Sequence, residues 1–234
     1  MNPIHSFETD TFPTSEGELA ITFLGHASLL MVFNGKNIYV DPFGEVADYS
    51  RLPKADIVFS THEHFDHLDL KALATIRTPG TILVLNPAGA EKLAGGHDKP
   101  ASIITMRNGG STTVEGIRVE AVPAYNLVHK RENGQPFHPQ GIGNGYVLTF
   151  GKTRLYLAGD TENTLEMKTL RDIDIAFLPM NLPFTMTPEM VADAAKAIRP
   201  RILYPYHYGN TDTNKLLELL KGEKNIEVRI RKLS

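Results

Sequence analysis

Residues 62–67 read His-Glu-His-Phe-Asp-His and follow closely on the apolar run Ile57-Val58-Phe59. The apolar run predicts a short buried strand, and the polar residues predict the loop in which that strand ends. A strand end is rigid and a loop is exposed, so together they can direct several side chains at one point and leave room for a ligand. This hexapeptide therefore constrains both the local fold and the chemistry that the chain can support.

The spacing within the hexapeptide favours metal binding. In an extended segment alternate residues face the same side, so His62, His64 and Asp66 share a direction. A turn at Asp66-His67 then brings His67 to a second position nearby. Two imidazoles suit one ion, and a carboxylate with an imidazole suits an adjacent ion, which can be zinc, iron or manganese. A solvated polar loop is the alternative, but three of the nine histidines within six residues argue against it.

The remaining sequence predicts two sheets. Asn34-Gly35 indicates a hairpin turn, and Thr187-Pro188-Glu189 indicates a helix start with a capping residue and a proline at the first position. Hairpins in each half are followed by strands that alternate with helices, which predicts an α/β (α+β) protein with sheets packed face to face and helices outside. No linker or composition break is visible, so residues 1–234 are expected to form one domain. Strands are expected at residues 19–24, 29–33, 37–40, 56–60, 81–85, 102–105, 112–114, 117–122, 146–150, 154–157, 173–178, 202–204 and 227–230.

Composition narrows the class of ligand and partner. The net charge of −3 and the pI near 6.3 do not provide the basic surface that nucleic-acid binding requires, so no nucleic acid is expected. The chain has no cysteine, so a metal must be held by imidazole and carboxylate. No signal peptide is visible, and no apolar run approaches the roughly 18 residues of a membrane span. A cytoplasmic location is therefore expected, and Tyr204, Tyr206 and Tyr208 are expected to be exposed, which would permit a homo-oligomer.

The motif His-x-His-x-Asp-His at residues 62–67 resembles that of the metallo-β-lactamase superfamily. Gly159-Asp160-Thr161, after a predicted strand, looks like the bridging aspartate of that superfamily, and Tyr206-His207-Tyr208 looks like its last histidine ligand. The segments Leu24-Gly25-His26-Ala27-Ser28 and Val40-Asp41-Pro42-Phe43 resemble the UlaG-like branch, which includes relatives of ascorbate-6-phosphate lactonase.

The resemblance implies a four-layer αββα sandwich of two mixed sheets flanked by helices, and a site for two divalent ions. Zn²⁺ is the expected metal, with Mn²⁺ or Fe²⁺ as alternatives. By analogy with the superfamily, a metal-bridging hydroxide would cleave an ester, lactone or phosphodiester bond in a small metabolite. Asp66 would accept the released proton and is the expected catalytic residue. The ligands implied by the resemblance are His62, His64 and His138 for one ion, Asp66, His67 and His207 for the other, and Asp160 as the bridge.

One imidazole of the first group is not determined by the motifs. His129 and His138 both lie in the irregular stretch 126–144, whose length inside a compact protein is typical of a functional loop. His138 is favoured because the order Phe137-His138-Pro139, followed by glycines, is more similar to the UlaG-like pattern. If His138 is the ligand, His129, which lies beside Lys130 and Arg131, is expected to be a loop residue or a contact to the substrate.

Further polar residues are candidates for supporting roles. His26 follows Gly25 at a strand end and either stabilises a turn or lies near the metals. Asp41 either accepts a hydrogen bond that orients a ligand imidazole or caps a turn before Pro42. Residues 181–186 either line a pocket mouth or pack in the core, and His5 and His97 are expected on the surface.

Two other functions compete with the metal-dependent hydrolase. A nuclease-type phosphodiesterase would fit the same motifs, but such relatives usually carry an added basic arm or inserted domain, for which this chain has neither the length nor the charge. A non-catalytic metal-binding sensor would be signalled by a missing ligand, and each of the expected positions has a candidate.

Overall fold

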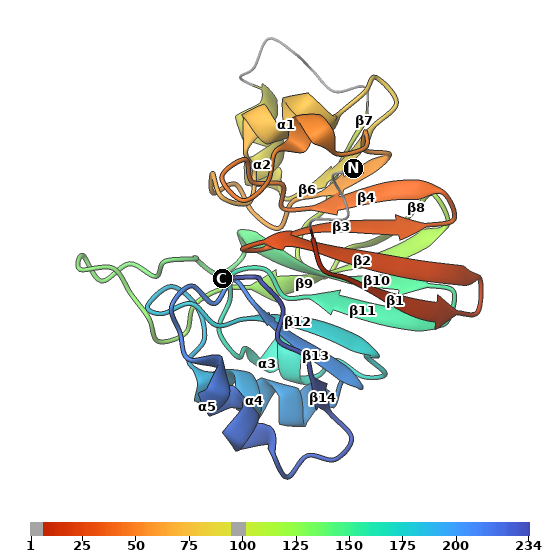
Figure 1. Cartoon of the computed structure of the whole chain (residues 1–234). Helices are drawn as coiled ribbons and strands as arrows, with labels where there is room; N and C mark the ends of the chain where they lie inside the picture. Colours follow the sequence, from red (N-terminus) through yellow and green to blue (C-terminus); the bar gives the residue numbers. More distant parts are fainter. Residues whose placement is uncertain (1–6, 95–101) are drawn as a thin grey trace.

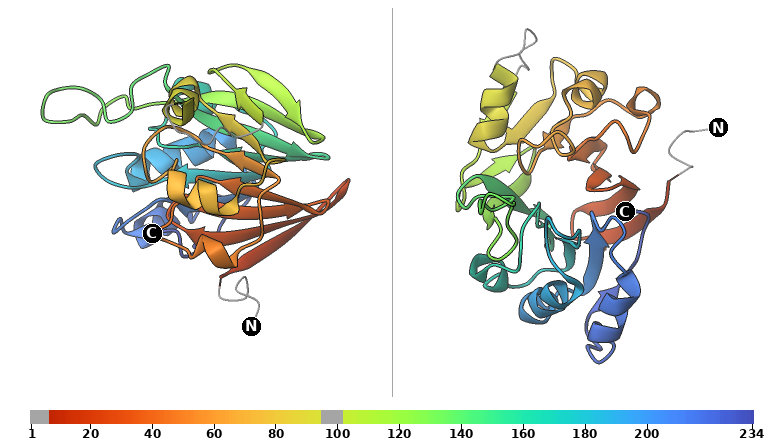
Figure 2. Two further views of the ribbon diagram at one scale, coloured as in Figure 1. Left: turned by 90° about the horizontal axis from the view of Figure 1, so that it is seen from above. Right: turned by 90° about the vertical axis from the view of Figure 1, so that its left-hand side faces the viewer.

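The computed structural model describes residues 7–94 and 102–234, which form two seven-stranded sheets. The sheets lie face to face, with helices on their outer faces (Figure 1). In the two further views, the helices of the first half lie over one sheet and those of the second half over the other (Figure 2). This arrangement confirms the predicted sandwich of two mixed sheets flanked by helices.

The first sheet has its strands in chain order from β1 to β7. Its first four strands pair antiparallel and the pairs from β4 to β7 are parallel. A 3₁₀ turn at Tyr49–Arg51 and the helices α1 (Leu70–Ile76) and α2 (Pro87–Ala94) belong to this half. The strands are β1 (Thr9–Thr14), β2 (Gly17–Gly25), β3 (Ser28–Phe33), β4 (Lys36–Val40), β5 (Ile57–Phe59), β6 (Ile82–Leu85) and β7 (Ser102–Thr105).

The second sheet also has its strands in chain order, from β8 to β14. Strands β8 to β11 pair antiparallel, and those from β11 to β14 are parallel. The helices of this half are α3 (Leu165–Lys168), α4 (Pro188–Ile198) and α5 (Thr213–Leu220). The strands are β8 (Ser111–Val114), β9 (Ile117–Ala124), β10 (Gly143–Phe150), β11 (Thr153–Leu157), β12 (Ile175–Pro179), β13 (Ile202–Tyr206) and β14 (Glu227–Val228).

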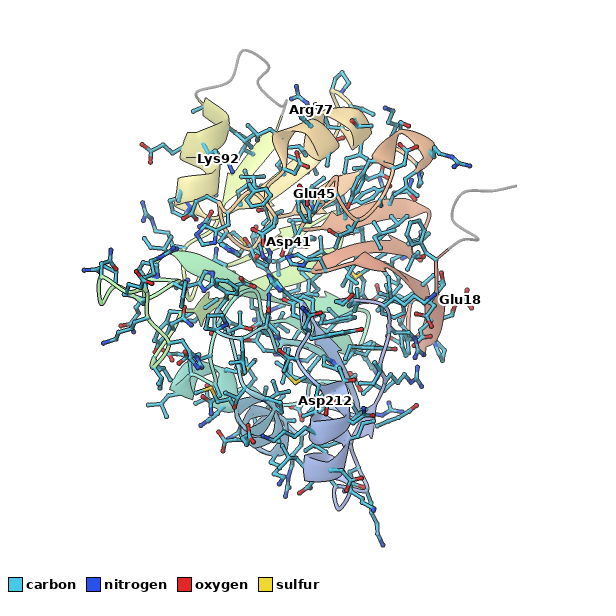
Figure 3. All side chains as sticks on the ribbon, turned by 60° about the vertical axis from the view of Figure 1, so that its left-hand side comes forward. Glu18, Asp41, Glu45, Arg77, Lys92 and Asp212 are labelled. Atoms are coloured by element: carbon cyan, nitrogen blue, oxygen red, sulfur yellow. The ribbon has the colours of Figure 1, made fainter. Side chains whose placement is uncertain are left out.

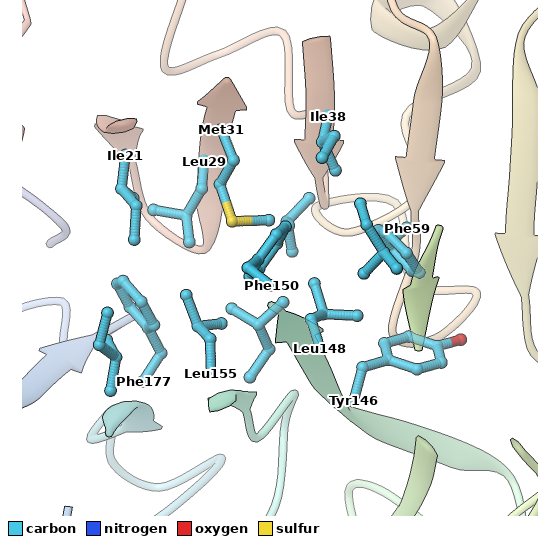
Figure 4. Close-up of a cluster of buried hydrophobic side chains, with 14 of the residues drawn as sticks. Ile21, Leu29, Met31, Ile38, Phe59, Tyr146, Leu148, Phe150, Leu155 and Phe177 are labelled. Carbon is cyan, nitrogen blue, oxygen red and sulfur yellow. The ribbon is translucent and has the colours of Figure 1, made fainter. Parts of the chain in front are cut away.

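The main core lies between the two sheets. Apolar side chains of alternate residues on each sheet meet there, because successive side chains of a strand point to opposite faces. Figure 4 shows this contact between Ile21, Leu29 and Phe59 of the first sheet and Leu148 and Phe177 of the second, all buried. Two further clusters lie beneath the helices on the outer faces. Core material on both faces of each sheet explains why the central strands read as continuous apolar runs.

Local signals placed most elements correctly. The Asn34-Gly35 turn joins β3 to β4 with both residues at positive φ, as expected for this dipeptide. Thr187 caps α4 by accepting a hydrogen bond from the amide of Met190, and Pro188 is the first helical residue. None of the described helices is long and apolar enough to cross a membrane.

Some expectations were wrong or incomplete. Tyr204 and Tyr206 are fully buried and Tyr208 is half-buried, because β13 is a parallel strand covered on both faces, so they do not form an exposed aromatic surface. Strand β1 was not predicted, and the last strand ends at Val228 rather than at residue 230. His5 and His97 lie outside the described residues.

Candidate metal centre

The candidate site lies where strands of both sheets end. Asp41 follows β4, the hexapeptide 62–67 follows β5, Asp160 follows β11 and His207 follows β13. The carboxyl ends of parallel strands lie at one edge of a sheet, and ligands of α/β proteins bind at such edges. Asp41 is labelled near the middle of the view in Figure 3, and its side chain is buried.

One group of histidines comes from the loop after β5 and from the segment before β10. One ring nitrogen from each of His62, His64 and His138 can be chosen so that the three atoms lie within 4.8 Å of one another. His62 Nε2 is 3.0 Å from His64 Nδ1, and the ring centroids of His62 and His138 are 5.1 Å apart. His62 and His138 are buried and His64 is half-buried. The three imidazoles that sequence assigned to one ion are thus brought together.

A second group lies beside the first. Asp66 Oδ2 is 3.5 Å from His67 Nε2 and 3.6 Å from His207 Nε2. His26 joins this group, with its Nε2 3.1 Å from Asp66 Oδ2 and its ring 3.7 Å from that of His207. His26, Asp41 and His207 all have φ between 43° and 54°, a region in which few non-glycine residues occur. Such backbone strain is typical of functional sites.

Asp160 lies between the two groups. Its Oδ2 is 3.2 Å from His138 Nε2 and 3.5 Å from His207 Nε2, and its Oδ1 is 3.5 Å from His67 Nε2. The preceding Gly159 has φ of +67°, and an added Cβ would lie 2.8 Å from the carbonyl oxygen of Asn144. Only glycine fits this close approach without a shift of the backbone, so Gly159 allows the turn that directs Asp160 into the site.

The donor set fits divalent metal ions. Ligand bonds of 2.0–2.1 Å in tetrahedral geometry separate neighbouring ligand atoms by about 3.3 Å, and the separations above are 3.0 to 3.6 Å. His67 Nε2, His207 Nε2 and Asp160 Oδ1 are buried and have no hydrogen-bond partner among the described residues. Buried polar atoms without a partner are costly, and three at one point indicate a site built for a cation.

Contacts behind the site orient the imidazoles. Asp41 Oδ2 is 2.8 Å from His67 Nδ1, and the hydroxyl of Thr61 donates to the same carboxylate at 2.8 Å. Asn126 Oδ1 accepts hydrogen bonds from the amide N–H of His138 and from its Nδ1. A hydrogen bond at one ring nitrogen sets the tautomer and directs the other nitrogen, which is how metal-binding histidines are held in proteins.

The imidazoles of the site shift the pKa values of its two carboxyl groups. Burial alone would raise the pKa of Asp160, but the imidazoles of His207, His67 and His138 hold that pKa well below its usual range. Burial likewise opposes the ionised form of Asp66, yet the neighbouring imidazoles of His207, His26 and His67 lower the pKa of this carboxyl group. The pKa of His62 is well below its usual value because of burial and the neighbouring His67. Both carboxylates are thus ionised at neutral pH.

The structure separates the two histidines between which sequence left a choice. His138 lies beside His64 and Asp160, whereas His129 Nδ1 is 2.7 Å from Glu162 Oε1. Glu162 is buried and accepts further hydrogen bonds from the backbone amides of residues 127–129 and from Asn126 Nδ2. Glu162 and Asn126 were missed by sequence reasoning, although Glu162 stands in the run Gly-Asp-Thr-Glu directly after the candidate bridging aspartate.

A pocket of about 520 Å³ opens above the candidate ligands. Asn181 and Phe184 line this pocket, while Met186 from the same segment is buried in the core. The other lining residues are His26, His64, Phe65, Asp66, Arg131, Phe137, His138, Asp160 and His207. A larger open cavity of about 990 Å³ is lined by Phe65, Lys92 and residues of the segments 43–50 and 68–75, and it contains none of the candidate ligands.

Comparison with known proteins assigns the chain to a family. A family model described as a beta-lactamase superfamily domain matches residues 20–207. A UPF0173 metal-dependent hydrolase of Methanopyrus kandleri is 32% identical over 203 residues, which cover 82% of this chain and 84% of the relative. Another, of Methanoculleus marisnigri, is 34% identical over 193 residues and covers 81% of each chain.

Among solved structures, a protein from Parabacteroides distasonis assigned as a metal-dependent hydrolase superposes with a TM-score of 0.90. It is 46% identical and the match covers 97% of this chain and 100% of the other. These matches confirm the resemblance to the metallo-β-lactamase superfamily that the motifs indicated. The chain therefore belongs to the beta-lactamase superfamily and to the UPF0173 family of metal-dependent hydrolases.

Proposed function

We propose that this protein is a binuclear metal hydrolase, UlaG-like in type, that cleaves an ester, lactone or phosphodiester bond in a small metabolite. His62, His64 and His138 would hold one ion, Asp66, His67 and His207 the other, and Asp160 would contact both. Zn²⁺ suits this set of five imidazoles and two carboxylates, and Mn²⁺ or Fe²⁺ are the alternatives.

The observation that carries this proposal is the convergence of partnerless buried ligand atoms beside a pocket that Asp160 and His207 line. His67 Nε2, His207 Nε2 and Asp160 Oδ1 face one another without hydrogen bonds among the described residues. The pocket above them has the volume of a small-molecule site. A pocket of this size and a net charge of −3 support a metabolite rather than a nucleic acid as the substrate.

Two divalent cations, when bound, supply Lewis acidity and lower the pKa of water into the neutral range. The remaining chemistry belongs to the side chains of the protein. Asp66 lines the pocket, and its Oδ1 makes no hydrogen bond among the described residues, so this atom can accept the proton that the attacking water loses. Asp41 and Asn126 hold His67 and His138 in place during this step. Phe65, Phe137 and Phe184 line the pocket with apolar surface.

We also propose that residues 1–234 act as one hydrolase domain. The largest core cluster contains residues of both sheets, from Phe12 to Leu233, so neither sheet has a separate core on its inner face. The candidate ligands likewise come from both sheets, since His62 follows a strand of the first and His207 a strand of the second.

The direct test combines metal analysis with a substrate panel. Elemental analysis of the purified protein is expected to find two divalent ions per chain. Lactones, carboxylic esters and phosphodiesters are then assayed before and after dialysis against a chelator, and again after Zn²⁺, Mn²⁺ or Fe²⁺ is restored. Turnover that chelation abolishes and one of these metals restores supports the proposal. Two bound ions without turnover of any compound in the panel would favour a sensor instead.

A further inference from the structure

The walls of the pocket differ in character from its floor. Five of the seven candidate ligands line the floor, whereas Phe65, Phe137 and Phe184 provide apolar walls and Arg131 provides a cation. Phe65 is 64% exposed and Phe184 is 43% exposed, and both line one pocket together with Phe137. Exposed apolar side chains that cluster in this way mark a binding site, whereas scattered ones do not. The metal-binding residues alone do not explain this combination.

The aromatic walls are held in place by the surrounding structure. The rings of Phe137 and Phe184 pack edge to face with centroids 5.0 Å apart. The amide of Phe184 donates to the carbonyl oxygen of Asn181, and its own carbonyl oxygen accepts from Asn126 Nδ2. Phe65 packs edge to face on Phe43, with centroids 5.4 Å apart. The apolar part of the pocket is thus preformed, which lowers the entropic cost of binding a ligand.

Arg131 lies at this wall on a short hairpin before β10, in the segment that extends from the sheets at the left of Figure 1. Its guanidinium carbon is 5.1 Å from the ring centroid of Phe137, and its Nη2 donates to the carbonyl oxygen of Phe137 at 3.3 Å. The hairpin is closed by a hydrogen bond from the amide of Arg131 to the carbonyl oxygen of Gln135. These contacts position the guanidinium beside the pocket.

The guanidinium has unused binding capacity. An arginine side chain carries five N–H donors, and Arg131 uses only one of them in a hydrogen bond to another described residue. No carboxylate of the described residues lies within 4.0 Å of it, in contrast to Arg229 and Arg231, which are both paired with Asp10. A guanidinium with free donors at a pocket wall is suited to a carboxylate or a phosphate of a ligand, which it binds with two parallel hydrogen bonds.

We propose that the substrate is an anionic metabolite with an apolar body, and that Arg131 selects it. This inference rests on the proposed hydrolase function of the same site. The scissile bond lies at the floor, the apolar body packs among Phe65, Phe137 and Phe184, and a carboxylate or phosphate remote from the scissile bond binds Arg131. Arg131 acts here as a specificity residue and takes no part in bond cleavage.

A matched pair of esters tests this assignment in the metal-loaded enzyme. Phenyl acetate and 4-acetoxybenzoate differ only in a carboxylate remote from the ester. The wild-type enzyme is expected to have a kcat/KM about tenfold higher for 4-acetoxybenzoate than for phenyl acetate, mainly through a lower KM. A hydrogen bond to a charged group contributes a binding free energy of about this size. Arg131→Ala is expected to abolish the preference, because its kcat/KM falls far more for 4-acetoxybenzoate than for phenyl acetate. Arg131→Lys is expected to retain part of the preference.

The neighbouring Lys130 offers a matched control. It is exposed on the same hairpin but does not line the pocket, so Lys130→Ala removes the same charge without removing the contact. This variant is expected to keep the preference for the carboxylate. The assignment is overturned if the wild-type enzyme shows no preference, if Arg131→Ala slows both esters equally, or if Lys130→Ala reduces the preference as much as Arg131→Ala does.

A binding measurement separates this inference from the proposed reaction. Calorimetric titration with biphenyl-4-carboxylate is expected to give an affinity about tenfold weaker for Arg131→Ala than for the wild-type or Lys130→Ala protein. If neither ester is hydrolysed, the ester-cleaving function fails, and this titration still decides the role of Arg131. Equal affinities in all three proteins would refute the proposed role of Arg131 in binding the carboxylate.

Discussion

Asp41 Oδ2 lies 2.8 Å from Nδ1 of His67, and neither side chain is exposed to solvent. The same carboxylate accepts hydrogen bonds from the amide and the hydroxyl of Thr61. Burial alone would lower the pKa of His67, but the carboxylates of Asp160 and Asp41 raise that pKa well above its usual value. Asp41 therefore holds the ring so that Nε2 faces Asp66 and Asp160, where a metal ion would bind.

Replacement of Asp41 by asparagine should weaken metal binding by about 10- to 100-fold, because an amide has only one acceptor oxygen for the three donors that the carboxylate satisfies. Competition with a chromophoric chelator measures this affinity. Asp48→Asn is the control, since Asp48 is an exposed cap of the 3₁₀ turn and asparagine caps equally well. Wild-type affinity in the Asp41 variant would show that this contact does not support the site.

Replacement of Asp66 by asparagine should reduce turnover far more than metal content. Loss of a general base costs about 10²- to 10⁴-fold in rate, whereas the amide oxygen can still contact an ion. Elemental analysis and steady-state kinetics on the same preparation separate the two effects. Asp69→Asn, at the cap of α1, should change neither. Equal losses of metal and activity would make Asp66 a ligand only.

The two histidines of the irregular segment should behave differently. His138→Ala is expected to release one metal ion per chain and to abolish turnover, since His138 lies among the candidate ligands. His129→Ala should keep both ions, because its ring contacts Glu162 instead. Metal counts for the two variants provide the comparison. Loss of an ion from the His129 variant alone would reverse the assignment.

Asp10 connects the two ends of the described chain. Burial opposes its ionisation, but hydrogen bonds from Tyr204, Arg231 and Arg229 lower the pKa of Asp10 below its ordinary value of 3.8. A lowered pKa in the folded state stabilises the fold at pH values above 3.8, and this stabilisation is lost as the pH falls through the lowered pKa.

Asp10→Asn should therefore lower the free energy of unfolding by about 1–2 kcal/mol at pH 7, since the ion pairs are partly exposed and screened. The difference from the wild type should persist at pH 5 and shrink as the pH falls below 3.8. Urea unfolding in the presence of chelator at each pH excludes a contribution from metal release. Asp212→Asn, an exposed cap of α5, is the control. A difference that does not change with pH would argue against the ion pairs as its source.

Features that depend on near neighbours in the chain were predictable. The hexapeptide 62–67 follows β5, Asp160 follows a Gly turn after β11, and the Thr187-Pro188 start of α4 lies where its capping residues indicated. Strand β1 escaped prediction because Thr9–Thr14 contains Pro13 and few apolar residues and pairs only with β2 at the edge of the sheet. Tyr204 and Tyr206 were expected on the surface because an apolar strand and an exposed aromatic stripe have similar local patterns.

The candidate ligand types, their grouping around the hexapeptide and the superfamily could be inferred from residues, since they depend on side-chain chemistry and on spacing within one short segment. The choice between His138 and His129, the support of His67 by Asp41 and the placement of Arg131 at an aromatic wall depend on contacts between segments far apart in the chain. Asn126 and His138 are 12 residues apart, and Asp41 and His67 are 26 apart. No local periodicity encodes such pairs, because the packing of two sheets sets which loops meet at their edges.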